Sequence, residues 1–331
     1  MRSLPHPTCI FCGSAGDLIY TDLRDCLFGT PGIWKIRRCP RSECGLLWLD
    51  PLPVEEDIEE AYDRYYTHGP SDTVKRPFAV FSDKLRQLYH WLLRLTKVAS
   101  EREKLDLGYL TEIAAGKVLD VGCGDGSRLS RLRAKGWNVQ GQELDIRAAK
   151  IAREHYGVPV HVGALKDAPF RPEEFDAIIM FHVIEHVHDP VSLLANCNRL
   201  LKRGGTLVVL TPNSRSYGHK IFRSHWRGLE PPRHLQIFSP DSLCELGNRA
   251  GVGNRVVWTT AANAHHFVIG SYQIRRTMSG TEIHGLDLVR MVSAAVHQLG
   301  LSLLHRVAPD SGEECVLKVV KEPLDRPRQV L

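Results

Sequence analysis

The stretch VLDVGCGDGS, residues 118–127, decides the fold of this chain. A short apolar run is followed by Gly122, Gly124 and Gly126, and the residues after them predict a helix. Glycines let the backbone turn sharply and let a ligand approach the main chain, while amide groups at the helix start face that ligand. A dinucleotide-binding loop would need its third glycine at position 127, where this chain has Ser127. The spacing therefore disfavours a dinucleotide.

Two acidic residues accompany the glycines. Asp120 lies inside the apolar run, and Glu143 lies 23 residues further on, at the end of the next predicted strand. A carboxylate beside the loop would repel a pyrophosphate but would attract an ammonium or a sulfonium group. A carboxylate at the second position can accept hydrogen bonds from two ribose hydroxyls. The alternative for Glu143 is a solvated acid at the end of a strand.

Strands and helices alternate from residue 116 onward. This pattern predicts a parallel sheet with helices on both faces, so the expected fold is a doubly wound, mostly parallel, seven-stranded α/β sheet. The predicted strands are 117–122, 138–143, 158–163, 175–180, 205–211, 255–260 and 315–320, and the predicted helices are 127–135, 145–155, 190–201 and 239–250.

Four of the nine cysteines lie in the first 44 residues, as a C-x2-C pair followed by a C-x4-C pair. A segment of about 45 residues is too small to bury an adequate core, and four thiolates would complete the tetrahedral shell of a structural zinc ion. The expected zinc ligands are Cys9, Cys12, Cys39 and Cys44. Free thiols are the alternative. The other five cysteines, Cys123 among them, are interpreted as small hydrophobic residues.

The chain is expected to divide into a zinc-binding unit at 1–50, a helical linker at 51–105 and a large α/β domain at 106–331. The linker contains a predicted amphipathic helix at 79–95. The large domain contains an insertion at about 261–310, in which Leu288, Val292, Val296, Leu299 and Leu303 line one side of a helix. We expect this stripe to face the core, and the alternatives are a homodimer interface or a membrane-surface contact.

Composition excludes several classes of protein. The 331 residues include 43 Lys and Arg against 38 Asp and Glu, and this net charge of +5 is small for a dedicated nucleic-acid binder. No run of eighteen apolar residues predicts a transmembrane helix, and the N-terminus lacks the hydrophobic region of a signal peptide. We therefore expect a cytoplasmic protein with reduced cysteines.

The motifs taken together resemble the class I S-adenosylmethionine-dependent methyltransferases, and most closely the bacterial group with an N-terminal zinc ribbon. The resemblance rests on CIFCG, CPRSECGLLWLDPLP, VLDVGCGDGS, GQELD, FDAIIMFHVIEHVHDP, LLKRGGTLVVLTPN and HWRGLEPPRHLQIF. It implies S-adenosylmethionine as methyl donor and a structural Zn2+ ion. The residues that it implies for donor binding are Asp120, Gly122, Cys123, Gly124, Glu143, Leu144, Ala164, Leu165 and His182.

Two stretches are expected to reach the methyl acceptor, because ligands of such sheets bind beyond the carboxyl ends of the strands. FHVIEHVHDP contains Glu185 and His186, and the later loop contains several arginines and the PPRHL histidine, His234. The resemblance makes His234 the first candidate for a general base and His186 the second. The basic loop suits an anionic acceptor, or its arginines pair with local acids. Tyr62, Tyr65 and Tyr66 are candidates for a lid or for packing.

The sequence thus predicts a methyltransferase that acts on a small molecule, with a hydroxyl of a sugar, a nucleotide-linked sugar or a natural-product intermediate as the expected acceptor. Methylation of RNA or of a surface polysaccharide is the alternative, and a non-catalytic zinc-ribbon binding module is a further one. The glycine spacing disfavours a dehydrogenase.

Overall fold

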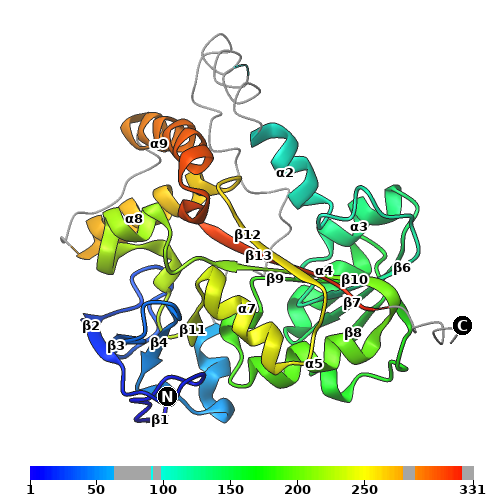
Figure 1. Cartoon of the computed structure of the whole chain (residues 1–331), viewed down its shortest axis with the longest axis horizontal. Helices are drawn as coiled ribbons and strands as arrows, with labels where there is room; N and C mark the ends of the chain where they lie inside the picture. The colour runs from blue at the N-terminus through cyan, green and yellow to red at the C-terminus, as the bar shows by residue number, and fades with distance from the viewer. Residues whose placement is uncertain (63–90, 92–97, 279–287, 323–331) are drawn as a thin grey trace, which may run out of the picture.

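The structure is a computed structural model that describes residues 1–62, 91, 98–278 and 288–322. Its centre is a seven-stranded sheet with the strand order β12-β13-β10-β9-β6-β7-β8 (Figure 1). Five neighbouring strands, β10 to β8 in that order, run parallel, and β13 is antiparallel to both of its neighbours. This confirms the predicted mostly parallel α/β fold. The strands are β6 (Lys117–Val121), β7 (Asn138–Glu143), β8 (Val160–Val162), β9 (Phe175–Phe181), β10 (Leu201–Pro212), β12 (Arg255–Thr260) and β13 (Glu314–Val320).

Helices cover both faces of this sheet, because successive residues of its strands point to opposite sides. Val118 packs with helices α2 (Val98–Asp106), α3 (Ser127–Ala134) and α4 (Ile146–Glu154). Leu119, the next residue, packs with α5 (Pro190–Leu200) and α7 (Pro240–Arg249). The central strands are therefore apolar on both faces, and polar residues concentrate at the ends of the strands.

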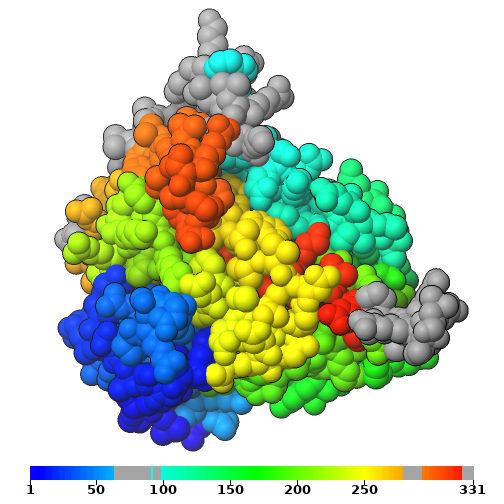
Figure 2. Space-filling model, viewed as in Figure 1, coloured from blue at the N-terminus to red at the C-terminus, as the bar shows by residue number. Residues whose placement is uncertain are grey.

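The N-terminal residues form a second, antiparallel sheet that includes a strand from the large domain. Its order is β11-β4-β3-β2, in which β4 of the N-terminal part pairs with β11, through Trp48 opposite Gln236. In Figure 2 the blue N-terminal residues lie directly against the yellow and yellow-green surface of the large domain. The strands are β2 (Asp17–Leu23), β3 (Trp34–Arg38), β4 (Leu47–Asp50) and β11 (Gln236–Ile237), and a separate pair joins β1 (Ser3–Leu4) to β5 (Leu52–Pro53).

The described part of the predicted linker is largely helical. A 3-10 helix spans Glu55–Tyr62, and α2 follows at Val98–Asp106. The predicted helix at 79–95 lies almost wholly outside the described residues, as do Tyr65 and Tyr66. No described helix is both long and apolar enough to cross a membrane.

The insertion contains two helices, α8 (Ala264–Met278) and α9 (Leu288–Val307), which pack against each other. Our expectation that the apolar stripe of α9 faces the core is wrong for Val296 and Leu303, which are 61% and 54% exposed. The side chains of Leu288 and Val292 lie outside the described residues.

The buried face of α9 instead carries Ala294, Gln298 and Leu301. The Gln298 amide explains this orientation. Its nitrogen donates to the carbonyl of Ala261 at 2.7 Å, and its oxygen accepts from the amide of His265 at 3.1 Å. A buried amide with these partners is stable, whereas rotation of the helix would leave them unpaired.

Candidate functional site

The glycine loop at the end of β6 has the backbone conformation that the sequence predicts. Gly122 and Gly124 have φ angles of +67° and +55°, a region that residues with a side chain rarely adopt. A Cβ atom at Gly122 would lie 2.3 Å from a methyl carbon of Val183, so this glycine also allows the loop to pack on the residue after His182. A Cβ atom at Gly124 would meet nothing within 4 Å, which leaves open space beside the loop.

Asp120 in β6, two residues before Gly122, is fully buried. Its Oδ2 atom lies 3.4 Å from Nη1 of Arg128, and its Oδ1 atom is buried without a hydrogen-bond partner among the described residues. Burial raises the pKa of Asp120 to about 7, although the Arg128 charge opposes this shift. An unpartnered carboxylate oxygen in this position is suited to bind a cationic group of a ligand.

Glu143 at the end of β7 turns toward the glycine loop. Its Oε2 atom accepts the amide of Gly124 at 2.8 Å, and Oε1 accepts the amides of Leu144 and Asp145 at 2.8 and 3.0 Å. Burial raises the pKa of Glu143, and these backbone hydrogen bonds oppose the shift. Because each carboxylate oxygen has two lone pairs, Oε1 is saturated by its two backbone partners, and Oε2 can still accept one hydrogen bond from a ligand.

The other predicted donor-site residues lie near this loop in different ways. Leu144 is 68% exposed, which suits an apolar ligand surface, and Ile146, which our sequence analysis missed, is 69% exposed on the same turn. Ala164 is half-buried and Leu165 is buried. The thiol of Cys123 points into the sheet, because its sulfur lies 2.6 Å from where a Cβ of Gly141 would be. Cys123 therefore faces the ligand space only with its main chain.

His182 follows β9 and is held between two carboxylates. Its Nδ1 atom lies 3.2 Å from Oε1 of Glu185, and Nε2 lies 2.9 Å from Oε1 of Glu314. Burial lowers the pKa of His182, but both carboxylates outweigh this effect and raise it to about 9. The ring is 40% exposed, whereas both carboxylates are buried. His182 is therefore the member of this group that a second ligand can contact.

The two carboxylates differ in their remaining partners. Glu185 also accepts the hydroxyl of Thr211 at 3.0 Å. Burial opposes its ionisation, yet the hydrogen bond from His182 and the nearby histidines lower its pKa to about 2. The Oε2 atom of Glu314 is buried and has no partner within the described ranges. We call His182, Glu185, Glu314 and Thr211 the histidine–carboxylate cluster.

Our sequence analysis gave no role to Glu314. It follows another acid, Glu313, and immediately precedes the apolar run of the last strand. Two adjacent acidic residues at the start of a buried strand could have indicated a site, because a buried carboxylate needs a partner in the fold.

His234 and His186 lie behind this cluster. Their ring centroids are 4.8 Å apart, and Nδ1 of His234 is 2.7 Å from the carbonyl of Gly228. Nδ1 of His186 is 3.0 Å from both the Arg233 carbonyl and the Tyr62 hydroxyl. Burial lowers the pKa of both histidines, that of His234 strongly. The buried position of His234 does not favour contact with an acceptor.

His234, together with Glu185 and His186, forms a group of three possible metal ligands that the sequence did not predict. Ligand atoms of Glu185, His186 and His234 all lie within 4.8 Å of one another, so the three could hold a metal ion. Glu185 and His234 are buried and His186 is half-buried, and Glu185 is already bonded to His182 and Thr211.

Three of the four arginines of the loop pair with acids, whereas Arg223 is exposed. Arg215 binds Asp241 at 2.5 Å, and Arg227 forms a hydrogen bond with Glu230. The fully buried Arg233 binds Glu230 at 2.9 Å and Asp25 at 2.8 Å. Burial opposes ionisation of Asp25, but Arg233 lowers its pKa to about 2. Arg233 thus joins the N-terminal part to the loop.

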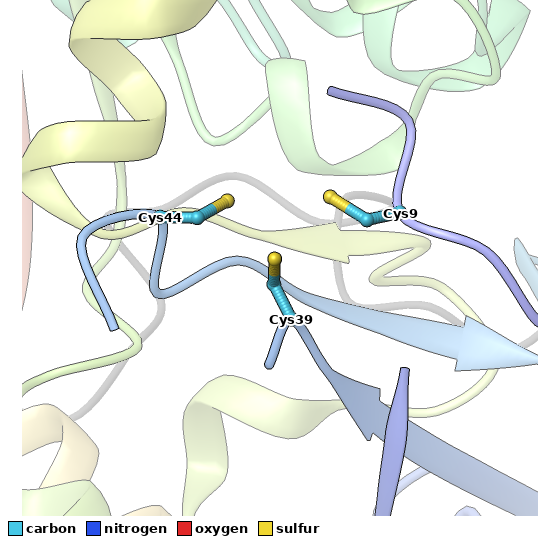
Figure 3. A group of neighbouring side chains, drawn as sticks. All are labelled: Cys9, Cys39 and Cys44. Atoms are coloured by element: carbon cyan, nitrogen blue, oxygen red, sulfur yellow. The ribbon is translucent and has the colours of Figure 1, made fainter. Parts of the chain in front are cut away.

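The N-terminal cysteines come together as their spacing predicts. Figure 3 shows the thiols of Cys9, Cys39 and Cys44 turned toward one another. These three sulfur atoms lie within 4.8 Å of one another, and the sulfur of Cys12 lies 3.5 Å from that of Cys39. Four sulfurs at about 2.3 Å from one zinc ion would be about 3.8 Å apart, so the arrangement fits such an ion.

Comparison with known proteins identifies the large domain. Residues 83–255, slightly more than half of the chain, match a family model described as "Methyltransferase domain". The chain belongs to this methyltransferase family. The matched range includes the glycine loop, both donor-site acids and His182, and it excludes the N-terminal cysteines.

Curated relatives of the methyltransferase include two ubiquinone biosynthesis O-methyltransferases. The protein from Nitrosomonas europaea is 32% identical over 191 residues, which are 51% of this chain and 80% of the relative. The protein from Chromobacterium violaceum is 31% identical over 189 residues, which are 52% of this chain and 82% of the relative.

Solved structures similar to the methyltransferase include two enzymes with low sequence identity. A possible histamine N-methyltransferase from Thermotoga maritima is 22% identical, with a TM-score of 0.45 and coverage of 74% of this chain and 98% of that one. A phosphoethanolamine N-methyltransferase from Haemonchus contortus, solved with S-adenosylhomocysteine, is 17% identical, with a TM-score of 0.48 and coverage of 84% and 63%.

The donor-site residues fit S-adenosylmethionine, the methyl donor of this family. The unpartnered Oδ1 atom of Asp120 suits the ammonium group, and Gly124, which has open space where a side chain would be, binds Glu143 through its amide. Glu143 suits the ribose hydroxyls.

The pKa of Asp120 predicts how donor-site binding depends on pH. Without ligand the carboxyl titrates near pH 7, because burial disfavours its charged form. A bound ammonium stabilises the charged form, so binding below pH 7 must release a proton. We expect the Kd of S-adenosylhomocysteine, measured by calorimetry, to rise about tenfold per pH unit below about pH 7. Asp120→Asn should bind weakly at every pH, and a constant Kd in the unchanged protein would contradict the assignment.

The buried Arg233 predicts a large effect on stability. Arg233→Met leaves Asp25 and Glu230 buried without their shared cation. We expect a loss of about 3–5 kcal/mol in the free energy of unfolding, measured by urea titration. Arg215→Met removes the exposed ion pair with Asp241 and serves as control, with an expected loss of at most about 1 kcal/mol. Equal losses in the two variants would contradict this role of Arg233.

Proposed function

We propose that this methyltransferase transfers a methyl group from S-adenosylmethionine to a hydroxyl oxygen of a small molecule. The observation that carries the proposal is His182, an exposed ring held by two buried carboxylates directly beside the glycine loop. A proton-binding group next to the donor is what the methylation of a hydroxyl requires, because the oxygen must lose its proton as the methyl group arrives.

The donor site positions the reacting carbon. In the proposal, Asp120 binds the ammonium of the methionine part, the main chain of the glycine loop lies along it, and Glu143 binds the ribose. Leu144 and Ile146 suit the adenine ring, because both are apolar and largely exposed on the turn after β7. The donor brings an already activated methyl group, so the protein mainly has to orient the acceptor and exclude water.

His182 faces the acceptor in the proposed mechanism, since its ring is exposed while His186 is half-buried and His234 is buried. Glu185 and Thr211 fix the orientation of its Nδ1 side. The unpartnered Oε2 atom of Glu314 gives the cluster a free acceptor for a further proton. Three coupled groups take up a proton as a unit, so the cluster as a whole acts as the base.

The methyl transfer breaks one bond, forms another and moves one proton. The carbon–sulfur bond of the donor breaks with its electron pair going to sulfur, and the acceptor oxygen forms the new bond to carbon. The hydroxyl proton moves to His182. Because the two carboxylates raise the pKa of His182 to about 9, the imidazole is mostly protonated at neutral pH. Only its neutral form accepts the proton, so the step becomes faster as the pH rises toward 9. His186 and His234 then support the position of the cluster, in place of the base role that the resemblance suggested for His234.

Two observations favour a hydroxyl on an aromatic ring over the sugar hydroxyl that we expected. The relatives are named as O-methyltransferases of ubiquinone biosynthesis. The arginines Arg215, Arg227 and Arg233, which would bind an anionic sugar nucleotide, are paired with acids. A phenol ionises at about pH 10, which a histidine–carboxylate base can match far better than it can match an alcohol.

The proposal is tested by transfer of labelled methyl groups from S-adenosylmethionine. One set of acceptors consists of catechols and other phenols, and the other consists of nucleotide-linked sugars. We expect incorporation into phenolic oxygen, identified by mass spectrometry and NMR of the product. Exclusive transfer to a sugar would overturn the preference for aromatic acceptors, and transfer to nitrogen or carbon alone would overturn O-methylation.

His182 and His234 make a matched pair of variants. We expect His182→Asn to lower kcat by about 100-fold to 10,000-fold, because it removes the base next to the acceptor. Its affinity for S-adenosylhomocysteine should be unchanged. We expect His234→Asn to lower the melting temperature while keeping most of its kcat below that temperature, since His234 is enclosed by protein. The opposite pattern of kcat values would restore His234 as the base.

We further propose that Cys9, Cys12, Cys39 and Cys44 bind a structural zinc ion. A shell of four thiolates leaves no position for a substrate, so the ion would act on the fold and not on the chemistry. The carbonyl of Cys44 accepts a hydrogen bond of 2.6 Å from Ser239, which caps the start of α7. The ion would thereby support the junction between the N-terminal sheet and the large domain.

Metal analysis tests the zinc site. We expect about one equivalent of zinc in the purified protein, and its loss together with a lower melting temperature in Cys39→Ser. Cys26→Ser removes a cysteine outside the group and should keep both the zinc and the melting temperature. A metal-free wild-type protein that melts at the same temperature with and without added zinc would contradict the proposal.

A further inference from the structure

We infer that Arg128 binds the carboxylate of the methionine part of the donor, so that Asp120 and Arg128 together recognise an amino-acid zwitterion. The inference rests on the assignment of S-adenosylmethionine as the ligand of the glycine loop. It adds a residue outside the set that the sequence indicated, and it gives the site selectivity for the amino-acid end of the donor.

The first observation is that the ion pair between the two side chains is incomplete. Nη1 of Arg128 lies 3.4 Å from Oδ2 of Asp120, whereas charge-assisted hydrogen bonds are usually about 2.7–2.9 Å long. Oδ1 of Asp120 has no partner in the described part of the chain, although the residue is fully buried. A pair that served only to neutralise a buried charge would be expected to satisfy both oxygens.

The second observation concerns the guanidinium group itself. It carries five N–H donors, and within the described residues the bond from Nη1 to Asp120 is its one hydrogen bond. The guanidinium carbon lies 4.2 Å from the centroid of the Phe181 ring. This cation–π contact holds the group above the end of β9 while most of its donors remain available.

The third observation is the position of the pair between the two halves of the site. Asp120 lies at the end of β6, and Phe181 is the residue before His182 on the neighbouring strand β9. The amino-acid end of the donor must lie here, because the ribose end belongs to Glu143 on the other neighbour of β6, β7.

The chemistry of the ligand completes the argument. The ammonium and carboxylate of an amino acid are attached to the same carbon, so an ammonium on Asp120 brings the carboxylate within a few ångströms of it. Asp120 alone would repel that carboxylate. A guanidinium beside Asp120 removes the repulsion and offers the paired N–H groups that a carboxylate accepts best.

The test compares three ligands by calorimetry. They are S-adenosylhomocysteine, its decarboxylated analogue, which keeps the amine, and 5′-methylthioadenosine, which lacks both groups. Removal of the Arg128 charge raises the pKa of Asp120 further, so each titration is repeated between about pH 7 and pH 9.5 to separate protonation of Asp120 from loss of the carboxylate contact. The variants are Arg128→Met, Arg128→Lys and, as a matched control on the same helix, the exposed Arg131→Met.

We expect Arg128→Met to raise the Kd of S-adenosylhomocysteine by about tenfold to 100-fold, which is the range for the loss of a hydrogen bond between charged groups. The Kd values of the decarboxylated analogue and of 5′-methylthioadenosine should change little in this variant. Arg128→Lys should recover part of the loss, and Arg131→Met should bind all three ligands as the unchanged protein does.

Equal weakening of S-adenosylhomocysteine and its decarboxylated analogue in Arg128→Met would overturn the inference, because Arg128 would then act only through Asp120. Failure of the unchanged protein to bind any of the three ligands would instead overturn the assignment of the donor. The two failures are therefore distinguishable.

Discussion

Ionisable side chains that are removed from water need partners, and this requirement organises the whole site. Arg233 is fully buried, so it draws Asp25 from the N-terminal part and Glu230 from the loop after β10 into one network. The same requirement places His182 between Glu185 and Glu314 at the end of the central strands. At the polar end of the otherwise apolar sheet, these charged side chains are thus paired with groups of opposite charge.

Asp120 is where this pairing is incomplete. Its pKa near 7 reflects burial that Arg128 offsets only in part, and one of its oxygens has no partner among the described residues. A site that binds a cation needs a carboxylate oxygen without a partner in the free protein, because a fully hydrogen-bonded carboxylate could not bind the ligand. The loss of stability in the free protein is recovered when the ligand binds.

The N-terminal sheet and the loop between β10 and β11 are one structural unit. Because β4 pairs with β11, the residues between β10 and β11 are held on one side by the N-terminal part and on the other by α8. Cys44, one of the proposed zinc ligands, binds the start of α7 through its carbonyl. Acceptor specificity in this protein is therefore expected to depend on residues far from the glycine loop in sequence.

The sequence by itself determined the order of strands and helices, the position of the donor loop and the grouping of four cysteines. Each depends on local rules: apolar periodicity sets the elements, and only glycine adopts the backbone angles of Gly122 and Gly124 freely. Tertiary structure alone decided that α9 turns Val296 outward, that Arg215, Arg227 and Arg233 pair with acids, and that His182 is exposed while His234 is enclosed. These outcomes depend on contacts between residues distant in the chain, because burial and charge pairing are properties of the packed molecule and leave no local pattern.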